Sequence, residues 1–591
     1  MNEQTWTIEG LVLDRRSFSL RRNGKALRLD PKPLELLFLL VEGQGAVISH
    51  DEALRRVWGE GVFVNGEAAL YTAVKKIRQA IGDATLIETV PGKGYRLRAA
   101  THSRTGGAMD SAPSGQEEQR LAILPLVNLS NDPEQEYFSD GLTEELISTV
   151  SRLLRGQMGV IARTSVMRLR AVSKPVQEIA RELNVQYLVE GSVRRHAGRV
   201  RITVQLLRAA DGTGLWGESF ERALDDVFSL QSEIALATAT AIGLQISPQA
   251  ILGVEKAKPM VIDAEVHDLY LRARYLLSQR ARPTIQAAMG YFREALAIDP
   301  AFAPAIASLA FCHALLPITS ILRPHDCFPA AQSLASEALS LDPTQADAQV
   351  ALGLVDFWYR RDWDAARDHF TNAATLNPGD SAPPMFLAHI HSVLGKHDEA
   401  LIAIAAALRL DPISPIVRTH HGHFLYNAGR SRDALVPLRQ VLELTPQFWV
   451  AHLMQGKALA TPDHLPGTAP GISGTSAEAI ESFRLSERFS VGNTEGLAFR
   501  IHTLATSGHE SAARESLAEM QQMHGNHPVP PLHRALAILG TGDRGAALEL
   551  LEEGFAEHDV RLIFLLVESR WRALGESHYA QALGRAGLPN P

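Results

Sequence analysis

The carboxy-terminal half of the chain repeats a pattern of small and apolar residues with a regular period, and no other feature constrains the fold as strongly. Small or apolar residues lie twelve, eight and five positions before Pro300, at Ala288, Phe292 and Ala295. The same phase recurs along the chain at Pro343, Pro378, Pro412, Pro446, Val491, Gly525 and Asp559. Four of the seven intervals between these marks are 34 residues. A unit of this size buries its apolar stripe only against its neighbours, so the pattern predicts an all-α solenoid with an extended concave binding surface.

This period, with proline ending the second helix of each pair, resembles the tetratricopeptide repeat. The resemblance covers residues 260–591, and a Gly-, Pro-, Thr- and Ser-rich insert at 461–476 fills one stretched interval. It implies protein or peptide ligands for the array.

Length, charge and cysteine usage bound the class of protein. A chain of 591 residues exceeds one core, so we expect three or more domains. The net charge of −8 argues against general nucleic-acid coating, although residues 1–100 carry about three more Lys and Arg than Asp and Glu. No apolar run approaches the roughly 18 residues of a membrane span, and no secretory signal is visible. We expect a cytoplasmic protein without a membrane partner, in which Cys312 and Cys327 are packing residues.

The first hundred residues predict short strands followed by capped helices. Segments LVLD, FSLRR and ALRLD have strand character, and Asn23-Gly24 marks a hairpin turn. Asp30 is placed to cap a first helix that starts at Pro31. Ser49 and Glu52 have the spacing of a capping box for a second helix.

A third helix over residues 65–81 carries the candidate chemistry. Leu70, Val74, Ile77 and Ile81 recur at helical spacing and define its buried face. The opposite face and its flanks hold small, hydrogen-bonding and cationic residues, namely Ala68, Tyr71, Thr72, Lys75, Lys76, Arg78 and Gln79. Such side chains can contact base edges and neutralise phosphates in a major groove, although a solvated helix face has a similar composition.

The hairpin TVPGKGYRL at 89–97 closes this unit, with glycines on both sides of Lys93. Taken in order, the elements resemble the OmpR/PhoB-type winged-helix domain. The matching positions are Leu34, Leu37, Val47-Ile48-Ser49, Leu54, Val57-Trp58-Gly59, Leu70, Ile77-Arg78, Gly82-Asp83, Thr89-Val90, Gly92 and Gly94-Tyr95-Arg96.

The resemblance implies double-stranded promoter DNA as a partner, with the third helix in the major groove and the wing near the minor groove. It also implies contact with RNA polymerase through the loop at 59–64, where we name Glu60, Val62 and Phe63. Pro91 stands where many members have arginine, so Lys93 and Arg96 must supply the positive charge of the wing. With the winged helix first, we expect no receiver domain ahead of it.

Residues 101–119 predict a flexible linker, because they combine Ser, Gly, Ala, Pro and charge without periodicity. Residues 120–250 then alternate strand and helix patterns and predict an α/β domain. The strings AILPLVNLSNDPEQEYFSDGLTEELI, VIARTS, YLVEGSVRR and LWGESFER resemble the FlgO-like, TolB-amino-terminal-like domain. That resemblance implies a family but no definite role.

Two clusters were weighed as metal or acid/base sites. We interpret Asp140 as the cap of a helix over 141–154, with Glu144 and Glu145 as acids of its first turn. His420, His421 and His423 lack a cysteine or carboxylate at ligand spacing, so the sequence predicts no metal site. Phosphate-loop, zinc-protease and nucleophile-elbow motifs are absent from the sequence, and we expect neither enzyme activity nor a cofactor.

The predicted fold class is therefore multidomain α/β plus α, in the order winged helix (1–100), linker (101–119), FlgO-like domain (120–250) and repeat array (260–591). This order resembles soluble regulators of HilA-like architecture and differs from the membrane-anchored CadC and ToxR type. It predicts a sequence-specific transcriptional regulator that is controlled through its carboxy-terminal regions. An interaction scaffold whose winged helix docks protein is the alternative. The sequence leaves open the operator, the sign of regulation, the input signal and the oligomeric state.

Overall fold

The fold was analysed in a computed structural model of the full chain. The structure describes residues 4–8, 11–14, 19–22, 25–27, 29–42, 48–58, 66–81, 87–90, 94–97, 102–105, 119–130, 132, 135–170, 174–196, 198–223, 227–246, 263–279, 282–318, 322–461, 476–490, 492–526 and 529–590. The chain divides into two compact units, Met1–Gly115 and Gln116–Pro591.

The first unit opens with an antiparallel sheet of order β4-β3-β2-β1-β8. Its strands are β1 (Gln4–Ile8), β2 (Leu11–Asp14), β3 (Ser19–Arg22), β4 (Lys25–Leu27) and β8 (His102–Thr105). Two of them differ from expectation. Strand β1 was not predicted, and the predicted linker begins with β8, which pairs with β1 from Thr7↔His102 to Gln4↔Thr105. Backbone hydrogen bonds hold the two strands together. The side chains of β8 are polar, so its sequence lacks the apolar residues by which a strand is predicted.

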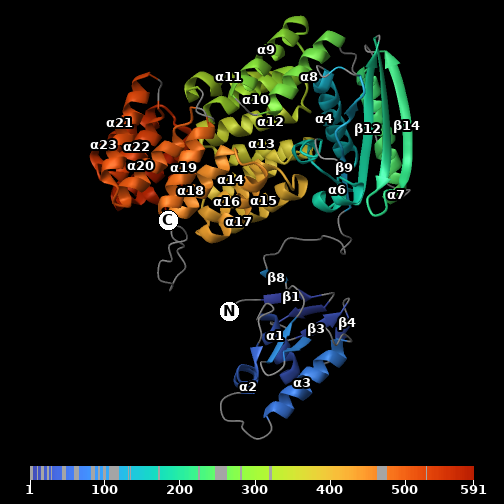
Figure 1. Ribbon diagram of the computed structural model, residues 1–591, viewed down its shortest axis with the longest axis vertical. Helices are drawn as coiled ribbons and strands as arrows, with labels where there is room; N and C mark the ends of the chain where they lie inside the picture. Colours follow the sequence, from blue (N-terminus) through green and yellow to red (C-terminus); the bar gives the residue numbers. More distant parts are fainter. Residues whose placement is uncertain are drawn as a thin grey trace. The chain divides into compact units, whose positions relative to one another are not determined.

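Three helices and a small sheet complete the unit (Figure 1). Helices α1 (Pro31–Glu42), α2 (His50–Trp58) and α3 (Gly66–Ile81) lie beside the sheet β5-β7-β6. Its strands are β5 (Ile48–Ser49), β6 (Ile87–Val90) and β7 (Gly94–Leu97). The Glu52 amide donates to Ser49 Oγ at 3.2 Å, which confirms Ser49 as the cap of α2. Helix α1 starts at Pro31 as predicted, and its Leu36, Leu37 and Phe38 are almost wholly buried.

The second unit begins with a mixed sheet of order β11-β9-β12-β13-β14. The strands are β9 (Arg120–Ile123), β10 (Val127–Asn128, paired to β12), β11 (Gly159–Val160), β12 (Tyr187–His196), β13 (Arg199–Arg208) and β14 (Gly214–Ala223). Helices α4 (Glu136–Leu153) and α7 (Val227–Ile246) pack against the sheet, while α5 (Arg163–Met167) and α6 (Val176–Leu183) are connecting helices. On β13, Val200, Ile202, Val204 and Leu206 are buried as their alternation predicts.

The interpretation of Asp140 as a helix cap is wrong. Helix α4 starts at Glu136, so Asp140 lies inside it and is 4% exposed. Its carboxylate forms ion pairs with Arg170 and Arg163, and Glu144 pairs with Arg163 at 3.3 Å and with Arg274. Glu145 Oε1 lies 3.7 Å from Nε2 of His267. These acids are therefore held by partners from outside α4, which local sequence spacing could not indicate.

The repeat region is a series of antiparallel helix pairs (Figure 1). They are α8 (Ala264–Ser278) with α9 (Arg282–Ile298), α10 (Ala303–Ile318) with α11 (Pro324–Leu341), α12 (Ala346–Leu354) with α13 (Trp363–Leu376), α14 (Ala382–Val393) with α15 (His397–Leu410), α16 (Pro415–Asn427) with α17 (Ser431–Leu444), α18 (Trp449–Ala460) with α19 (Ser476–Ser490), α20 (Glu495–Thr506) with α21 (Glu510–Asn526), and α22 (Pro531–Gly540) with α23 (Arg544–Ala556). A π-helical turn, η4 (Val355–Arg360), extends α12.

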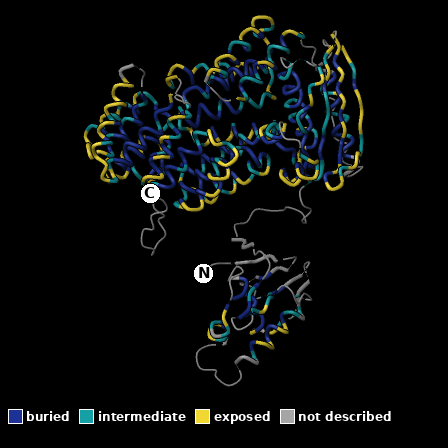
Figure 2. The backbone as a smooth tube through the Cα atoms, viewed as in Figure 1, coloured by how far each residue is buried: buried dark blue, intermediate teal, exposed yellow. Residues whose placement is uncertain are grey.

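The repeating small residues are buried as predicted. Ala288, Phe292 and Ala295 are fully buried, and so are Ala366 and Phe370 two pairs later. Figure 2 shows buried backbone running through the paired helices. The free thiols Cys312 and Cys327 lie in this core, consistent with a packing role. Within the described residues, no helix is both long enough and apolar enough to cross a bilayer.

The helix pairs end at α23, whose buried Ala547, Leu551 and Gly554 precede the last mark of the sequence phase at Asp559. Residues after α23 form short helices η5 (Val560–Phe564), η6 (Ser569–Leu574) and α24 (Glu576–Ala586) rather than another pair. This tail packs on the first helices of several repeats: Phe564 meets Trp358 and His423, and the Tyr426 hydroxyl donates to Glu568. The predicted concave surface is therefore partly covered by the chain's own carboxy-terminal segment.

Candidate nucleic-acid interface

Helix α3 has one buried face and one exposed face, as its spacing predicts. Leu70, Val74 and Ile77 are at most 1% exposed and belong to the core of the first unit. On the other side, Tyr71 is 64% exposed, and Thr72, Lys75 and Lys76 are also exposed. An exposed aromatic ring between hydrogen-bonding and cationic side chains is suited to contact with a polyanion.

Arg78 holds α3 against the wing. Its guanidinium donates to the Ile87 carbonyl at 2.6 Å and to Thr89 Oγ1 at 2.9 Å, so it joins the last turn of the helix to β6. The sequence assigned Arg78 to DNA contact, whereas the structure gives it bonds that position the wing. A guanidinium has five N–H donors, so these bonds do not exhaust its capacity.

The two lysines of α3 are in different electrostatic states. Nζ of Lys76 lies 2.5 Å from Oδ2 of Asp30, the residue that precedes α1. Lys75 has no ion-pair or hydrogen-bond partner among the described residues. The side chains of Lys75 and Lys76 are both exposed. Solvent therefore screens the ion pair between Lys76 and Asp30, and its net contribution to stability is small. Among the described residues, one lysine of α3 is therefore paired with an acid and the other is not.

The wing depends on a close backbone approach at Gly94. Its φ is +144°, and a Cβ built there would lie 1.9 Å from the carbonyl oxygen of Ile48 on β5. Gly94 pairs with Ser49, so the same residue that caps α2 also lies against the wing. Only glycine leaves room for this contact.

Arg96 is neutralised by its cross-strand neighbour. Its Nε and Glu88 Oε2 are 2.9 Å apart, and this hydrogen bond with the nearby negative charge raises the pKa of Arg96. The expected positive charge of Arg96 in the wing is thus offset within the hairpin. Lys93, the other predicted cation of the wing, lies outside the described residues, and so do the predicted polymerase-contact residues Glu60, Val62 and Phe63. Ala68 and Gln79 lie on α3, where the structure describes only their backbone.

Family comparisons agree with this domain order. Residues 24–97 match the family described as "Transcriptional regulatory protein, C terminal". Residues 117–251 match the HilA/YgeH-like transcriptional regulator second domain. The chain has the domain order of the HilA-like regulators. Its amino-terminal domain is thus of the OmpR/PhoB type, a DNA-binding domain of transcription regulation, and is followed by the HilA-like second domain and tetratricopeptide-like repeats.

Individual relatives span different parts of this architecture. The transcriptional regulator HilA of Salmonella typhimurium is 24% identical over 74% of this chain and 72% of its own length. A protein of Rhizobium meliloti named putative adenylate cyclase 3 is 32% identical over 43% of each chain, so the match spans less than half of that relative. The solved DNA-binding domain of Escherichia coli CadC is 23% identical over 17% of this chain and 98% of its own, with a TM-score of 0.16.

Sequence reasoning missed the partners that modify the interface. Asp30 was seen only as a helix cap, and Glu88 was not singled out. Asp30 and Lys76 are 46 residues apart, so only the fold reveals their contact. The Glu88–Arg96 pair had a usable signal, because the two residues oppose each other across the predicted hairpin.

Proposed function

We propose that this chain regulates transcription by sequence-selective binding of its amino-terminal domain to promoter DNA. In this proposal α3 enters the major groove and the wing approaches the neighbouring minor groove. The observation that carries it is the exposed face of α3, where Tyr71, Thr72 and Lys75 lie opposite a fully buried stripe. The regulator-type family match over residues 24–97 supports the same function.

The roles within the interface follow from the contacts. Lys75 supplies phosphate affinity, Tyr71 and Thr72 contact base edges or sugars, and Arg78 orients the wing as well as reaching DNA. Ala68, Lys76, Gln79, Lys93 and Arg96 complete the proposed surface, with Lys76 and Arg96 released from their acidic partners on binding. The loop at 59–64, with Glu60, Val62 and Phe63, is proposed to contact RNA polymerase.

Salt-dependent binding of the full chain to promoter fragments tests the proposal. Sites are first selected from genomic DNA, then measured against scrambled duplexes. Replacing Lys75→Ala together with Lys76→Ala should weaken binding and reduce the slope of log affinity against log salt by about one to two. Lys396→Ala, an exposed lysine of the repeat array, is the matched control and should leave binding unchanged. Equal affinity for selected and scrambled DNA would contradict sequence-selective regulation.

Regulation is proposed to enter through the second unit. A cavity of about 440 Å³ lies where α4 meets the repeats, lined by polar groups that include Glu144, Arg163, Arg274 and Asp347. A small polar ligand there, or a protein bound to the array, would act on the α/β domain and the repeats together.

We further propose the domain limits 1–100, 120–250 and 260–591, with the first sheet extended to Thr105 by β8.

An interaction scaffold is the second candidate, because the repeat array is the largest part of the chain. It predicts that the first unit binds protein and that the α3 double substitution has no effect on DNA occupancy in cells.

We also propose that the chain is not an enzyme and acts in the cytoplasm. The relative named putative adenylate cyclase gives a direct test: incubation with ATP and divalent cations should yield no cyclic AMP.

A further inference from the structure

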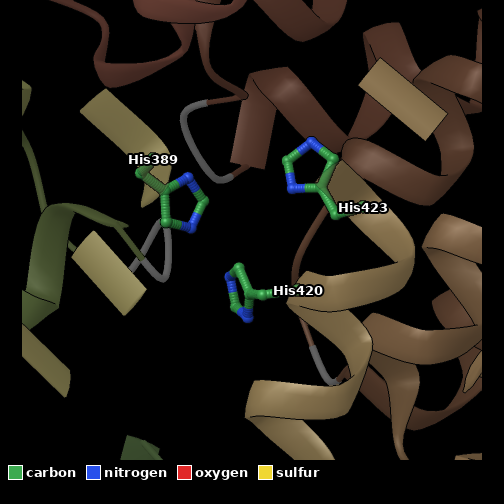
Figure 3. A group of neighbouring side chains, drawn as sticks. All are labelled: His389, His420 and His423. Carbon is green, nitrogen blue, oxygen red and sulfur yellow. The ribbon is translucent and has the colours of Figure 1, made fainter. Parts of the chain in front are cut away.

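Three histidine side chains converge inside the repeat array (Figure 3). His389 comes from α14, whereas His420 and His423 come from α16. One ring nitrogen of each lies within 4.8 Å of the others. The sequence showed only the two neighbours on α16, and the third imidazole comes from the adjacent repeat.

The repeat itself places these residues together. His389 and His423 are separated by one 34-residue period, so they occupy equivalent positions on successive first helices. His420 lies one turn before His423 and shares its face of α16. The imidazole rings of His389 and His420 have centroids 4.7 Å apart, and those of His389 and His423 are 5.8 Å apart.

The hydrogen bonds of the cluster leave nitrogen lone pairs available. Nδ1 of His420 lies 2.8 Å from the Ile416 carbonyl, which fixes the proton on Nδ1 and leaves a lone pair on Nε2. The Nδ1 atoms of His389 and His423 are buried and have no hydrogen-bond partner among the described residues.

We propose that His389, His420 and His423 form a three-nitrogen binding site for a transition-metal ion, with Zn²⁺ as the preferred occupant. Imidazole nitrogen is a common ligand of Zn²⁺, and three histidines are an established ligand set for it. Zn–N bonds of about 2.0–2.1 Å place tetrahedral ligands roughly 3.4 Å apart, so ring nitrogens now up to 4.8 Å apart must approach by up to about 1.4 Å. Rotation of the side chains supplies a change of this size without a backbone shift.

Aromatic side chains surround part of the cluster. The ring of Phe424 lies edge-on to that of His389, with centroids 4.8 Å apart. The ring centroid of Phe564, from the tail, lies 5.7 Å from that of His423. The ammonium group of Lys457 acts on His423 and opposes a cation; Glu568 lies 3.5 Å from it, but this carboxylate is shared with Arg570. A bound ion would tie α14 to α16 beneath the tail residue Phe564.

Cobalt substitution in the purified full chain tests the site. The protein is stripped with a chelator, and Co²⁺ is titrated while visible d–d absorption and bound metal per chain are measured. One equivalent should bind with the intense bands of a low-symmetry, four-coordinate ion, and Zn²⁺ should displace it. His420→Asn and His389→Gln should each weaken Co²⁺ affinity at least tenfold, in line with loss of a ligand.

His421→Gln is the matched control, because His421 lies on the same helix but outside the cluster. It removes one histidine and should leave the spectrum, the stoichiometry and the affinity unchanged. Circular dichroism on each variant verifies that the repeats remain helical, and the two separate ligand substitutions keep the test informative if one variant fails to fold. The proposal is overturned if the native chain shows no d–d bands, or if His421→Gln lowers affinity as much as the cluster substitutions.

Discussion

Nζ of Lys76 on α3 lies 2.5 Å from Oδ2 of Asp30, the residue that precedes α1. The pair joins the proposed DNA-reading helix to the start of the first helix, and it neutralises one of the two exposed lysines of α3. DNA phosphates would compete with Asp30 for this ammonium group. The carboxylate is therefore expected to set how much positive charge the helix offers to DNA.

Replacing Asp30→Asn should raise DNA affinity about two- to fivefold at low salt, because it frees Lys76 and removes a negative charge near the phosphates. The gain should shrink as salt increases. Fluorescence anisotropy of a labelled promoter duplex over a salt series measures both effects. Asp433→Asn, which removes an exposed carboxylate from the repeat array, is the control. An equal gain from this distant change would rule out the local explanation.

The substitution Gly94→Ala should disrupt the wing. Its Cβ would collide with the Ile48 carbonyl at 1.9 Å, and φ is +144°, so we expect roughly 3 kcal/mol of local destabilisation. Hydrogen exchange at the amides of β5 and β7 should become faster, and DNA affinity should fall. Gly290→Ala, where no atom lies within 4 Å of the new Cβ, should leave both unchanged. Unaltered exchange in Gly94→Ala would show that the β5–β7 contact is looser than the structure indicates.

Asp411 joins the α/β domain to the repeats. Its carboxylate, 1% exposed, accepts hydrogen bonds from Ser165 Oγ at 2.6 Å and from Ser381 Oγ at 3.1 Å. Asp411→Ala would remove the acceptor of both hydroxyls, although Ser165 Oγ still accepts from the Ile413 amide, and should lower the free energy of unfolding by about 3 kcal/mol in urea titrations. Asp411→Asn should lower it less, because burial already raises the pKa of this carboxyl and weakens its preference for charge. A loss as small as that of exposed Asp433→Ala would contradict this role.

The second unit should lose stability in mild acid. Burial lowers the pKa of His502 to about 4, below the value near 6.5 of an unfolded histidine. Between pH 6.5 and 4 the unfolded chain therefore binds more protons than the folded chain. The contribution of neutral His502 to the free energy of unfolding is complete above pH 6.5 and is lost as the pH falls toward 4. Urea midpoints measured across this range should fall, and His502→Gln should reduce the slope by up to one proton. A slope identical to that of the native chain would contradict the assignment to His502.

Elements with strong periodicity were predictable from sequence. The expected helix over 65–81 is α3 (Gly66–Ile81), and its expected stripe of Leu70, Val74 and Ile77 is buried. Failures occurred where backbone pairing or distant charge decided the structure. Strand β8 pairs with the edge of β1, and α4 starts before Asp140, whose carboxylate pairs with Arg163 and Arg170 instead of capping the helix.

By itself, the sequence determined which residues of each helix face the core, where the repeats fall, and which face of α3 is exposed, because these follow from the local period of apolar residues. Tertiary structure alone decided which charges remain available and which groups meet. Asp30 neutralises Lys76, and His389 joins His423 from the next repeat. The tail covers inner helices that the repeat pattern left open. Each of these depends on contact between residues far apart in the chain. Electrostatic and packing interactions between such residues produce no periodic pattern in the sequence.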